Sequence, residues 1–184
     1  GNGAERIIEK AFSLKEGSNI LYEEIVLDNP ALWWPNGHGE QNLYHLEAIL
    51  VDASGKVSHS LHSRFGVREV SWELTSEAPE DFKEKYMPVV NGRKIRMIGS
   101  NLIPPDLLFA RIPERAPHLL RVAKASGFTT LRVWGGGVIF TPEVYDLADE
   151  SGIMLMLEIP IANMDPKPDP DLLKNLDTTL LNII

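Results

Sequence analysis

Two charged side chains and one tryptophan stand within two short apolar segments of the sequence. Arg132 and Trp134 belong to the segment Thr129–Trp134, and Glu158 belongs to the segment Ile153–Ile159. Side chains alternate between the two faces of a strand, so Arg132 and Trp134 share one face and Glu158 points away from its apolar neighbours. On adjacent strands, the Arg132 and Glu158 side chains could form a charge-assisted pair. The indole of Trp134 has an apolar face that suits the C–H face of a sugar ring.

The segments that would position these residues alternate between strand and helix. Strands are predicted over Lys94–Gly99, Thr129–Trp134 and Ile153–Ile159. A helix with Leu119, Leu120 and Ala123 on one face ends at Gly127, and a second helix begins after Thr141 and ends at Gly152. This order implies right-handed parallel crossovers, which open either a doubly wound sheet or a (β/α)₈ barrel. A barrel takes about 250 residues, so only its opening third would fit here.

Two further segments complete this half of the chain. A long loop containing prolines is predicted over Ser100–Arg111, and it includes Asn101 and Asp106. A helix is predicted over Leu172–Ile184. We expect Asn101 to help orient the site, whereas Asp106 is expected to be a turn or capping residue.

Residues 1–90 have the composition of antiparallel β-structure. Apolar and β-branched residues concentrate in Ile20–Leu27, in Leu43–Val51 and at the ends of Phe65–Leu74. Turn formers such as Asp28-Asn29-Pro30 and Asp52–Gly55 separate these segments. We predict an immunoglobulin-like β-sandwich that is incomplete, since such a sandwich takes about 100 residues. The chain would then consist of a partial sandwich domain, residues 1–90, and an α/β domain, residues 91–184.

Composition argues against several partners and chemistries. The net charge of −8 argues against binding nucleic acid or an anionic membrane surface, since both need clustered lysines and arginines. Cysteine is absent, which excludes disulfides, thiolate metal sites and cysteine nucleophiles, and we expect no metal and no cofactor. No segment matches the roughly 20 apolar residues of a membrane-spanning helix. The acidity together with four Trp and four Tyr suits a neutral polyhydroxylated ligand.

Several motifs resemble those of family 2 glycoside hydrolases. Leu32–Gly39, with the letters LWWPNGHG, resembles a signature of the immunoglobulin-like domain that precedes their barrel. Asn91–Lys94 and the later Gly99–Pro105 resemble the start of the first barrel strand. Leu131–Gly137, with the letters LRVWGGG, and Tyr145–Ile153 resemble the second strand and helix of the β-mannosidase and exo-β-glucosaminidase branch.

The sequence departs from the family pattern at two places. Leu102 stands where the family usually has Trp, which would remove one possible stacking surface from the site. Glu158–Asn163 matches only loosely the acidic and aromatic segment that closes the third strand in β-mannosidases. These departures leave open which sugar the protein would bind.

The resemblance implies retaining hydrolysis of a terminal β-linked sugar by a glycosidase with two catalytic glutamates, whose carboxyl groups lie about 5–5.5 Å apart. In the family, one glutamate belongs to an Asn-Glu pair that ends the fourth barrel strand, and the other lies near the seventh strand. This sequence contains no Asn-Glu dipeptide. We therefore expect both catalytic residues to lie beyond Ile184 and this chain to be inactive alone. Its partners would be a carbohydrate substrate and the remaining domains of the parent chain, which we suspect to be periplasmic or secreted.

Within this resemblance, Trp134, Arg132, Glu158 and Asn101 are the expected substrate-binding residues. Trp134 would contact sugar, although burial between barrel and sandwich is the alternative. Arg132 and Glu158 would bind hydroxyl groups or tune a catalytic glutamate, or would form an ion pair with only a structural role. Trp33 and Trp34 are expected to pack one domain onto another, because they lie in a sandwich turn.

Two other functions are weighed against this interpretation. The glycines after Trp134 could form a dinucleotide-binding turn, but that fingerprint needs a third glycine where Phe140 stands. The remaining alternative is a non-catalytic sandwich module that binds carbohydrate or a protein partner. The sequence of the parent protein beyond Ile184 would separate the module from the enzyme.

Overall fold

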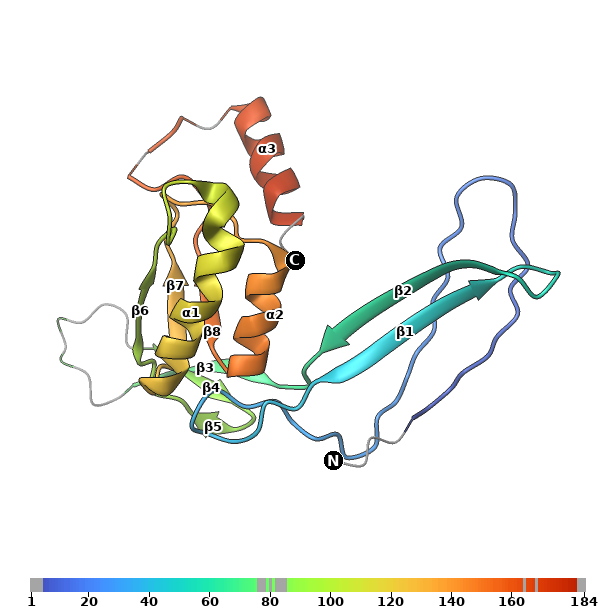
Figure 1. Ribbon diagram of the computed structural model, residues 1–184, viewed down its shortest axis with the longest axis horizontal. Coiled ribbons are helices and arrows are strands. Elements are labelled where there is room, and N and C mark those ends of the chain that lie inside the picture. The colour runs from blue at the N-terminus through green and yellow to red at the C-terminus, as the bar shows by residue number, and fades with distance from the viewer. Residues whose placement is uncertain are drawn as a thin grey trace. The chain divides into compact units, whose positions relative to one another are not determined.

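The computed structural model describes residues 5–75, 79, 81, 86–163, 165–167 and 169–181. The chain divides into two compact units, Gly1–Pro30 and Ala31–Ile184. The regular elements are all in the second unit (Figure 1): β1 (Tyr44–Val51), β2 (Val57–Phe65), β3 (Val70–Leu74), β4 (Tyr86–Val90), β5 (Arg93–Lys94), β6 (Gly99–Leu102), the 3₁₀ turn η1 (Phe109–Arg111), α1 (Ile112–Ala125), β7 (Thr130–Val133), α2 (Pro142–Ser151), β8 (Met154–Leu157) and α3 (Pro170–Leu181). Among the described residues, every helix is too short or too polar to cross a bilayer.

The described part of the first unit, residues 5–30, forms no β-ladder. Polar contacts hold it together: the Lys10 ammonium pairs with the Glu23 carboxylate, and the Arg6 guanidinium donates to the carbonyl of Val26. The strand predicted over Ile20–Leu27 is therefore wrong for this structure. A β-branched composition favours extended backbone, but a strand also needs a neighbouring chain segment to pair with.

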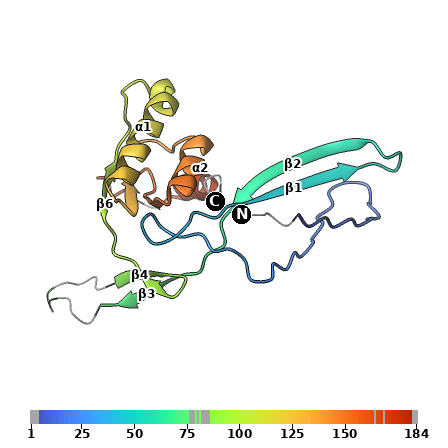
Figure 2. The ribbon, with the colours of Figure 1, turned by 60° about the horizontal axis from the view of Figure 1, so that its bottom comes forward.

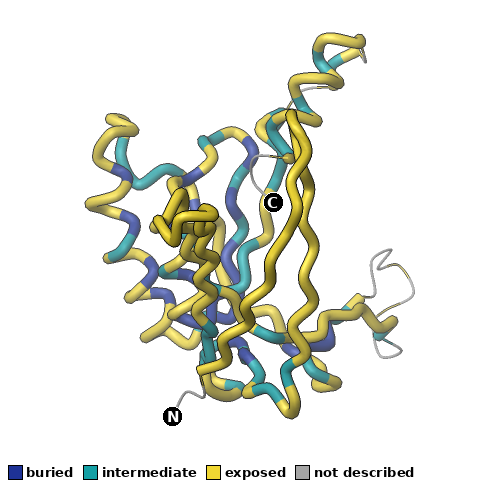
Figure 3. The backbone as a smooth tube through the Cα atoms, turned by 90° about the vertical axis from the view of Figure 1, so that its right-hand side faces the viewer, coloured by how far each residue is buried: buried dark blue, intermediate teal, exposed yellow. Residues whose placement is uncertain are grey.

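The antiparallel part of the second unit contains a long hairpin and a small sheet. β1 and β2 pair in the hairpin, and β3, β4 and β5 form the sheet in that order. The predicted turn at Asp52–Gly55 closes the hairpin: the Asp52 carboxylate accepts from the backbone N–H of Ser54 (2.8 Å) and of Lys56 (3.1 Å), and Gly55 adopts φ 85°. The hairpin is a continuous two-stranded ribbon that stays exposed along most of its length (Figures 2 and 3).

The parallel sheet has the strand order β6, β7, β8. The strands at Thr129–Trp134 and Ile153–Ile159 are confirmed, but the first parallel strand is Gly99–Leu102 and not Lys94–Gly99. The sequence of β6 is polar and resembles a loop, and its pairing with β7 makes it a strand. Gly99 lies opposite Thr130, and a side chain at Gly99 would place its Cβ 1.7 Å from the Thr130 carbonyl oxygen. Only glycine allows β6 to approach the backbone of Thr130 this closely. Gly99 is therefore required by the sheet, although glycine in a sequence usually indicates a turn.

The helices α1 and α2 pack side by side on one face of the parallel sheet (Figure 1). They share a buried core with the sheet, which consists of Leu102, Ile112, Ala116, Leu120, Ala123, Leu131, Val133, Phe140, Val144, Ala148 and Ile153. Both predicted helices are confirmed: α1 ends before Gly127, and α2 begins after Thr141 and ends at Gly152, which adopts φ 73°. The predicted helix near the C-terminus is present as α3 over its described residues.

The loop that carries Trp33 and Asn36 contacts the C-terminal ends of both core helices. Trp33 is 2% exposed, and its indole N–H donates to the carbonyl of Asp149 in α2 at 2.8 Å. The Asn36 side chain donates to the carbonyls of Lys124 (2.9 Å) and Phe128 (3.0 Å), at and just after the end of α1. The last carbonyls of a helix have no partner within the helix, so this loop supplies donors that they need. The packing role predicted for Trp33 is confirmed.

The contact between this loop and α2 yields a paired test at two glycines. Gly127 and Gly152 both follow a helix with positive φ, 75° and 73°. A Cβ at Gly127 meets nothing within 4 Å, whereas a Cβ at Gly152 would lie 2.6 Å from the backbone nitrogen of Asn36. We expect Gly127→Ala to lower the free energy of unfolding by about 1–2 kcal/mol, the cost of the left-handed backbone alone. Gly152→Ala should cost roughly 1–3 kcal/mol more because the loop must shift.

Denaturant unfolding of the two glycine variants and the wild type measures this difference. Equal losses for Gly127→Ala and Gly152→Ala would contradict the close contact between α2 and the loop at Asn36.

Candidate binding site at the ends of the parallel strands

A polar row crosses the face of the sheet that α1 and α2 do not cover. The row consists of Asn101, Arg132 and Glu158. Arg132 on β7 is in register with Asn101 on β6 and with Met156 on β8, and Glu158 follows Met156 by two residues on the same face. The opposite face presents Leu131 and its apolar equivalents to the helices. A row of polar side chains on an uncovered face, at the carboxyl ends of parallel strands, is where α/β proteins bind their ligands.

The ion pair predicted between Arg132 and Glu158 is present. The Arg132 Nε donates to Glu158 Oε1 at 2.6 Å, and the Arg132 NH2 group contacts the same oxygen. The side chains retain 39% and 33% of their exposure, so water reaches both and screens the pair.

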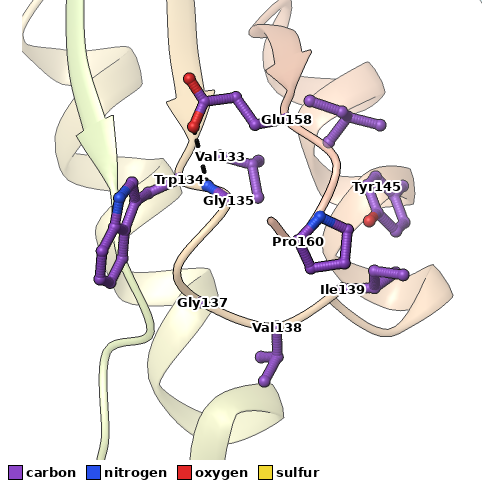
Figure 4. Close-up of a pocket in the computed structure, with 10 residues that line it drawn as sticks. Val133, Trp134, Gly135, Gly137, Val138, Ile139, Tyr145, Glu158 and Pro160 are labelled. Atoms are coloured by element: carbon purple, nitrogen blue, oxygen red, sulfur yellow. Dashed lines mark hydrogen bonds between the residues drawn. The ribbon is translucent and has the colours of Figure 1, made fainter. Parts of the chain in front are cut away.

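The second oxygen of Glu158 is held by the backbone. Glu158 Oε2 accepts the N–H of Gly135 at 2.9 Å (Figure 4). This backbone hydrogen bond, followed by the Arg132 guanidinium, holds the pKa of the Glu158 carboxyl below its usual value. Glu158 is therefore an anion at neutral pH, with hydrogen-bond accepting capacity left on its exposed side.

Asn101 belongs to the row because it lies in β6 and not in the loop where the sequence placed it. Its side-chain oxygen accepts from the Arg132 NH1 group at 2.9 Å. The hydrogen bond crosses between adjacent strands, at the position where the backbones are in register. The structure thus brings together Asn101, Arg132 and Glu158, three of the four residues expected at the site.

Trp134, the fourth expected residue, follows β7 at the same end of the sheet. It is half-buried, and a Cβ at Gly136 would lie 2.1 Å from its six-membered ring, so the indole lies directly against that glycine. Figure 4 shows the indole on one side of the strand end, with Tyr145, Ile139 and Pro160 on the other side. Trp134 therefore borders the row.

Gly135 is a site residue that the sequence analysis did not identify individually. A Cβ there would lie 2.5 Å from the carbonyl oxygen of Ile159, so only glycine brings this N–H close enough to bind Glu158. The available signal was the run of three glycines after Trp134, which was weighed above only as a dinucleotide-binding turn. The first of them instead approaches the neighbouring strand end.

A small cavity of about 10 Å³ lies behind the row, and Tyr145 contributes to its lining. The Tyr145 hydroxyl is buried and has no hydrogen-bond partner among the described residues. Burial raises the pKa of this hydroxyl. The space would hold about one water molecule, so it is too small for a sugar, and a sugar at this end of the sheet would lie on the open face of the row.

Leu102 and Asp106, both discussed in the sequence analysis, lie in different surroundings. Leu102 is 4% exposed and belongs to the core beneath the helices, so in this chain its position adds no surface to the site. The expectation that a tryptophan here would add a stacking surface concerns a side chain that this chain lacks, and it stays a prediction. Asp106 accepts the backbone N–H of Leu108 at 2.9 Å and pairs with Arg111 and Arg115, which confirms a turn residue.

Within the described residues, no group of three or more His, Asp or Glu side chains is placed to hold a metal ion. What the site offers is a fixed carboxylate, an amide and an aromatic surface at the carboxyl ends of parallel strands. Groups of this kind can bind a neutral polar ligand.

Comparison with known proteins identifies the family. Residues 3–68 match the family model for glycosyl hydrolases family 2. Among curated relatives, β-mannosidase A of Aspergillus clavatus is 32% identical over 154 residues, which cover 80% of this chain and 16% of the relative. The chain belongs to family 2 of the glycosyl hydrolases.

Solved structures agree with this assignment. The β-D-mannosidase of Dictyoglomus thermophilum is 35% identical and superposes with a TM-score of 0.71, over 82% of this chain and 18% of that one. An exo-chitosanase of Amycolatopsis orientalis is 31% identical with a TM-score of 0.60, over 71% of this chain and 14% of that one. The chain thus spans less than a fifth of the length of these three proteins.

The lowered pKa of Glu158 predicts how stability depends on pH. A carboxyl whose pKa is lower in the folded state stabilises the fold fully above its unfolded pKa, near 4.3, and loses this contribution as pH falls through the folded pKa. We expect Glu158→Gln to be less stable than wild type at neutral pH and to lose less stability on acidification. Denaturant unfolding midpoints between about pH 7 and pH 3 measure both. Parallel pH curves for the two proteins would show that Glu158 gains nothing from its partners.

Proposed function

We propose that this chain is a region of a retaining β-glycosidase of the β-mannosidase type. Residues 1–90 would belong to its immunoglobulin-like β-sandwich and residues 91–184 to the opening of its (β/α)₈ barrel. The two catalytic glutamates would come from segments beyond this chain. The observation that carries the proposal is the row of Asn101, Arg132 and Glu158 at the ends of three parallel strands, in a chain whose relatives include β-mannosidases.

The polarity of the uncovered sheet face supports a barrel over a doubly wound sheet. In a doubly wound fold, helices cover both faces, and the strands are apolar on both. Here one face packs against α1 and α2, while the other presents Asn101, Arg132 and Glu158. In a barrel that second face points inward, and its carboxyl end forms the mouth where substrates bind.

Each site residue would have a distinct role toward the sugar. Glu158, held as an anion, would accept a hydrogen bond from a hydroxyl group, and Trp134 would stack on the C–H face of the ring. Arg132 would hold Glu158 and Asn101 in place. None of these residues would be catalytic, since catalysis needs a general acid and a nucleophile about 5–5.5 Å apart.

The charge balance of the row favours a neutral sugar. Arg132 is already paired with Glu158, so the pair adds little net charge that would attract a charged substituent on a substrate. An ammonium group, as in glucosamine, would have to compete with Arg132 for the same carboxylate. A mannoside carries no charge and needs only hydroxyl partners, which supports a mannosidase over a glucosaminidase.

The proposal is tested by assaying this chain alone and the complete protein that contains it on aryl β-D-mannoside and aryl β-D-glucosaminide. We expect hydrolysis by the complete protein only, with preference for the mannoside and retained anomeric configuration. Turnover by the pure chain, abolished in Glu158→Gln, would contradict the assignment of catalysis to other segments. Sugar binding without hydrolysis by the complete protein would favour a non-catalytic module.

The role of Trp134 gives a separate prediction for the complete enzyme. Trp134→Ala should lower kcat/KM for the aryl mannoside by about 10- to 100-fold, because a stacking surface is lost. Trp72 in β3 is 56% exposed and lies outside the site, so Trp72→Ala is a matched control that should keep wild-type kinetics. If Trp134→Ala unfolds at much lower temperature while its folded fraction keeps normal kinetics, Trp134 is a packing residue only.

A further inference from the structure

The side-chain amide of Asn101 has two ends with opposite hydrogen-bonding chemistry, and Arg132 determines which end faces outward. A guanidinium group has only donors. The NH1 group of Arg132 lies 2.9 Å from the amide end that faces it, so that end must be the oxygen. The amide nitrogen, with its two N–H donors, is consequently turned away from Arg132.

This orientation is fixed because every member of the row is itself held. The backbone N–H of Gly135 binds one oxygen of Glu158, and the other oxygen binds Arg132 through Nε at 2.6 Å and through NH2. A guanidinium bound at two nitrogens to one carboxylate has its plane defined, which leaves NH1 to point at Asn101. The backbone of Asn101 is fixed in turn by its pairing with Arg132 in the sheet.

The amide nitrogen of Asn101 is available to a ligand. Asn101 is an exposed residue on the uncovered face, and among the described residues its nitrogen has no acceptor. On the other side of Arg132, the Glu158 carboxylate offers acceptor capacity. The row therefore presents a fixed donor at one end and a fixed acceptor at the other.

We propose that Asn101 is a specificity-determining residue whose amide N–H₂ donates a hydrogen bond to a hydroxyl oxygen of a neutral pyranose. This inference rests on the proposed glycosidase function and adds to it a direction of hydrogen bonding at one residue. The donor at Asn101 and the acceptor at Glu158 together would recognise a sugar through two of its oxygen atoms, one accepting and one donating.

The substitution Asn101→Asp tests the direction of this hydrogen bond. Aspartate keeps the shape and the acceptor that Arg132 needs, but it replaces the outward donor with an acceptor. In the complete enzyme, we expect kcat/KM for aryl β-D-mannoside to fall about 10-fold or more, with the thermal unfolding midpoint unchanged. Asn175, exposed on α3, provides a matched control: Asn175→Asp adds the same charge elsewhere and should keep wild-type kinetics.

A second variant separates recognition from support of Arg132. Asn101→Leu removes both ends of the amide. If Asn101 only supports Arg132, then Asn101→Asp keeps wild-type kcat/KM while Asn101→Leu loses it, and the proposal is overturned. If the outward donor binds substrate, both variants lose kcat/KM.

Monodeoxy analogues of the aryl mannoside locate the partner oxygen. One analogue should be hydrolysed by wild type and by Asn101→Asp with similar kcat/KM, because the oxygen that Asn101 binds is missing from it. A full loss in Asn101→Asp on every analogue would place the effect outside direct recognition and overturn the proposal. A wild-type enzyme that hydrolyses neither the mannoside nor the glucosaminide would overturn the glycosidase function itself. An active wild-type enzyme whose kcat/KM is unchanged in Asn101→Asp would overturn only the role of Asn101.

Discussion

One electrostatic requirement organises the strand ends: the guanidinium of Arg132 needs hydrogen-bond acceptors on its face of the sheet. Glu158 supplies one acceptor at 2.6 Å and Asn101 supplies another at 2.9 Å, from the strands on either side. A group with five donors and no acceptor orders whatever surrounds it. The ionised state of Glu158, the direction of the Asn101 amide and the close approach of Gly135 to Ile159 all accompany this arrangement.

The two faces of the parallel sheet thus have different roles, one in packing and one in presenting polar groups. The face beneath α1 and α2 is apolar and close-packed, and it sets the positions of the strands. The other face carries the polar row, whose geometry depends on strand register more than on loop conformation. A site built on paired strands is positioned more rigidly than one built on loops alone. This division suits the proposed recognition of a sugar by a few hydroxyl groups.

The sequence predicted the α/β elements well because they depend on local signals. Thr141 and Gly152 mark the ends of α2, and the alternation in Thr129–Trp134 gave the correct phase for Arg132. The contact between Arg132 and Glu158 followed from that phase. The strand β6 was misplaced because its polar sequence gives no strand signal, and only its pairing with β7 defines it.

The remaining errors have the same cause, which is dependence on a distant partner. Ile20–Leu27 has the composition of a strand but no ladder in the described chain. The role of Gly135 needed the position of Ile159, 24 residues later in the sequence, which no local rule supplies.

The loop at Trp33 and Asn36 has a consequence for how the chain acquires its structure. Its hydrogen bonds to the ends of α1 and α2 join residues 88 to 116 positions apart in the sequence. Contacts of such long sequence separation form late and slow the search for the native state. During synthesis, the carbonyls at the end of α2 become available only after Asp149 has emerged, long after the loop itself. The loop at Trp33 and Asn36 and the ends of α1 and α2 should therefore acquire their final order together, in one cooperative step.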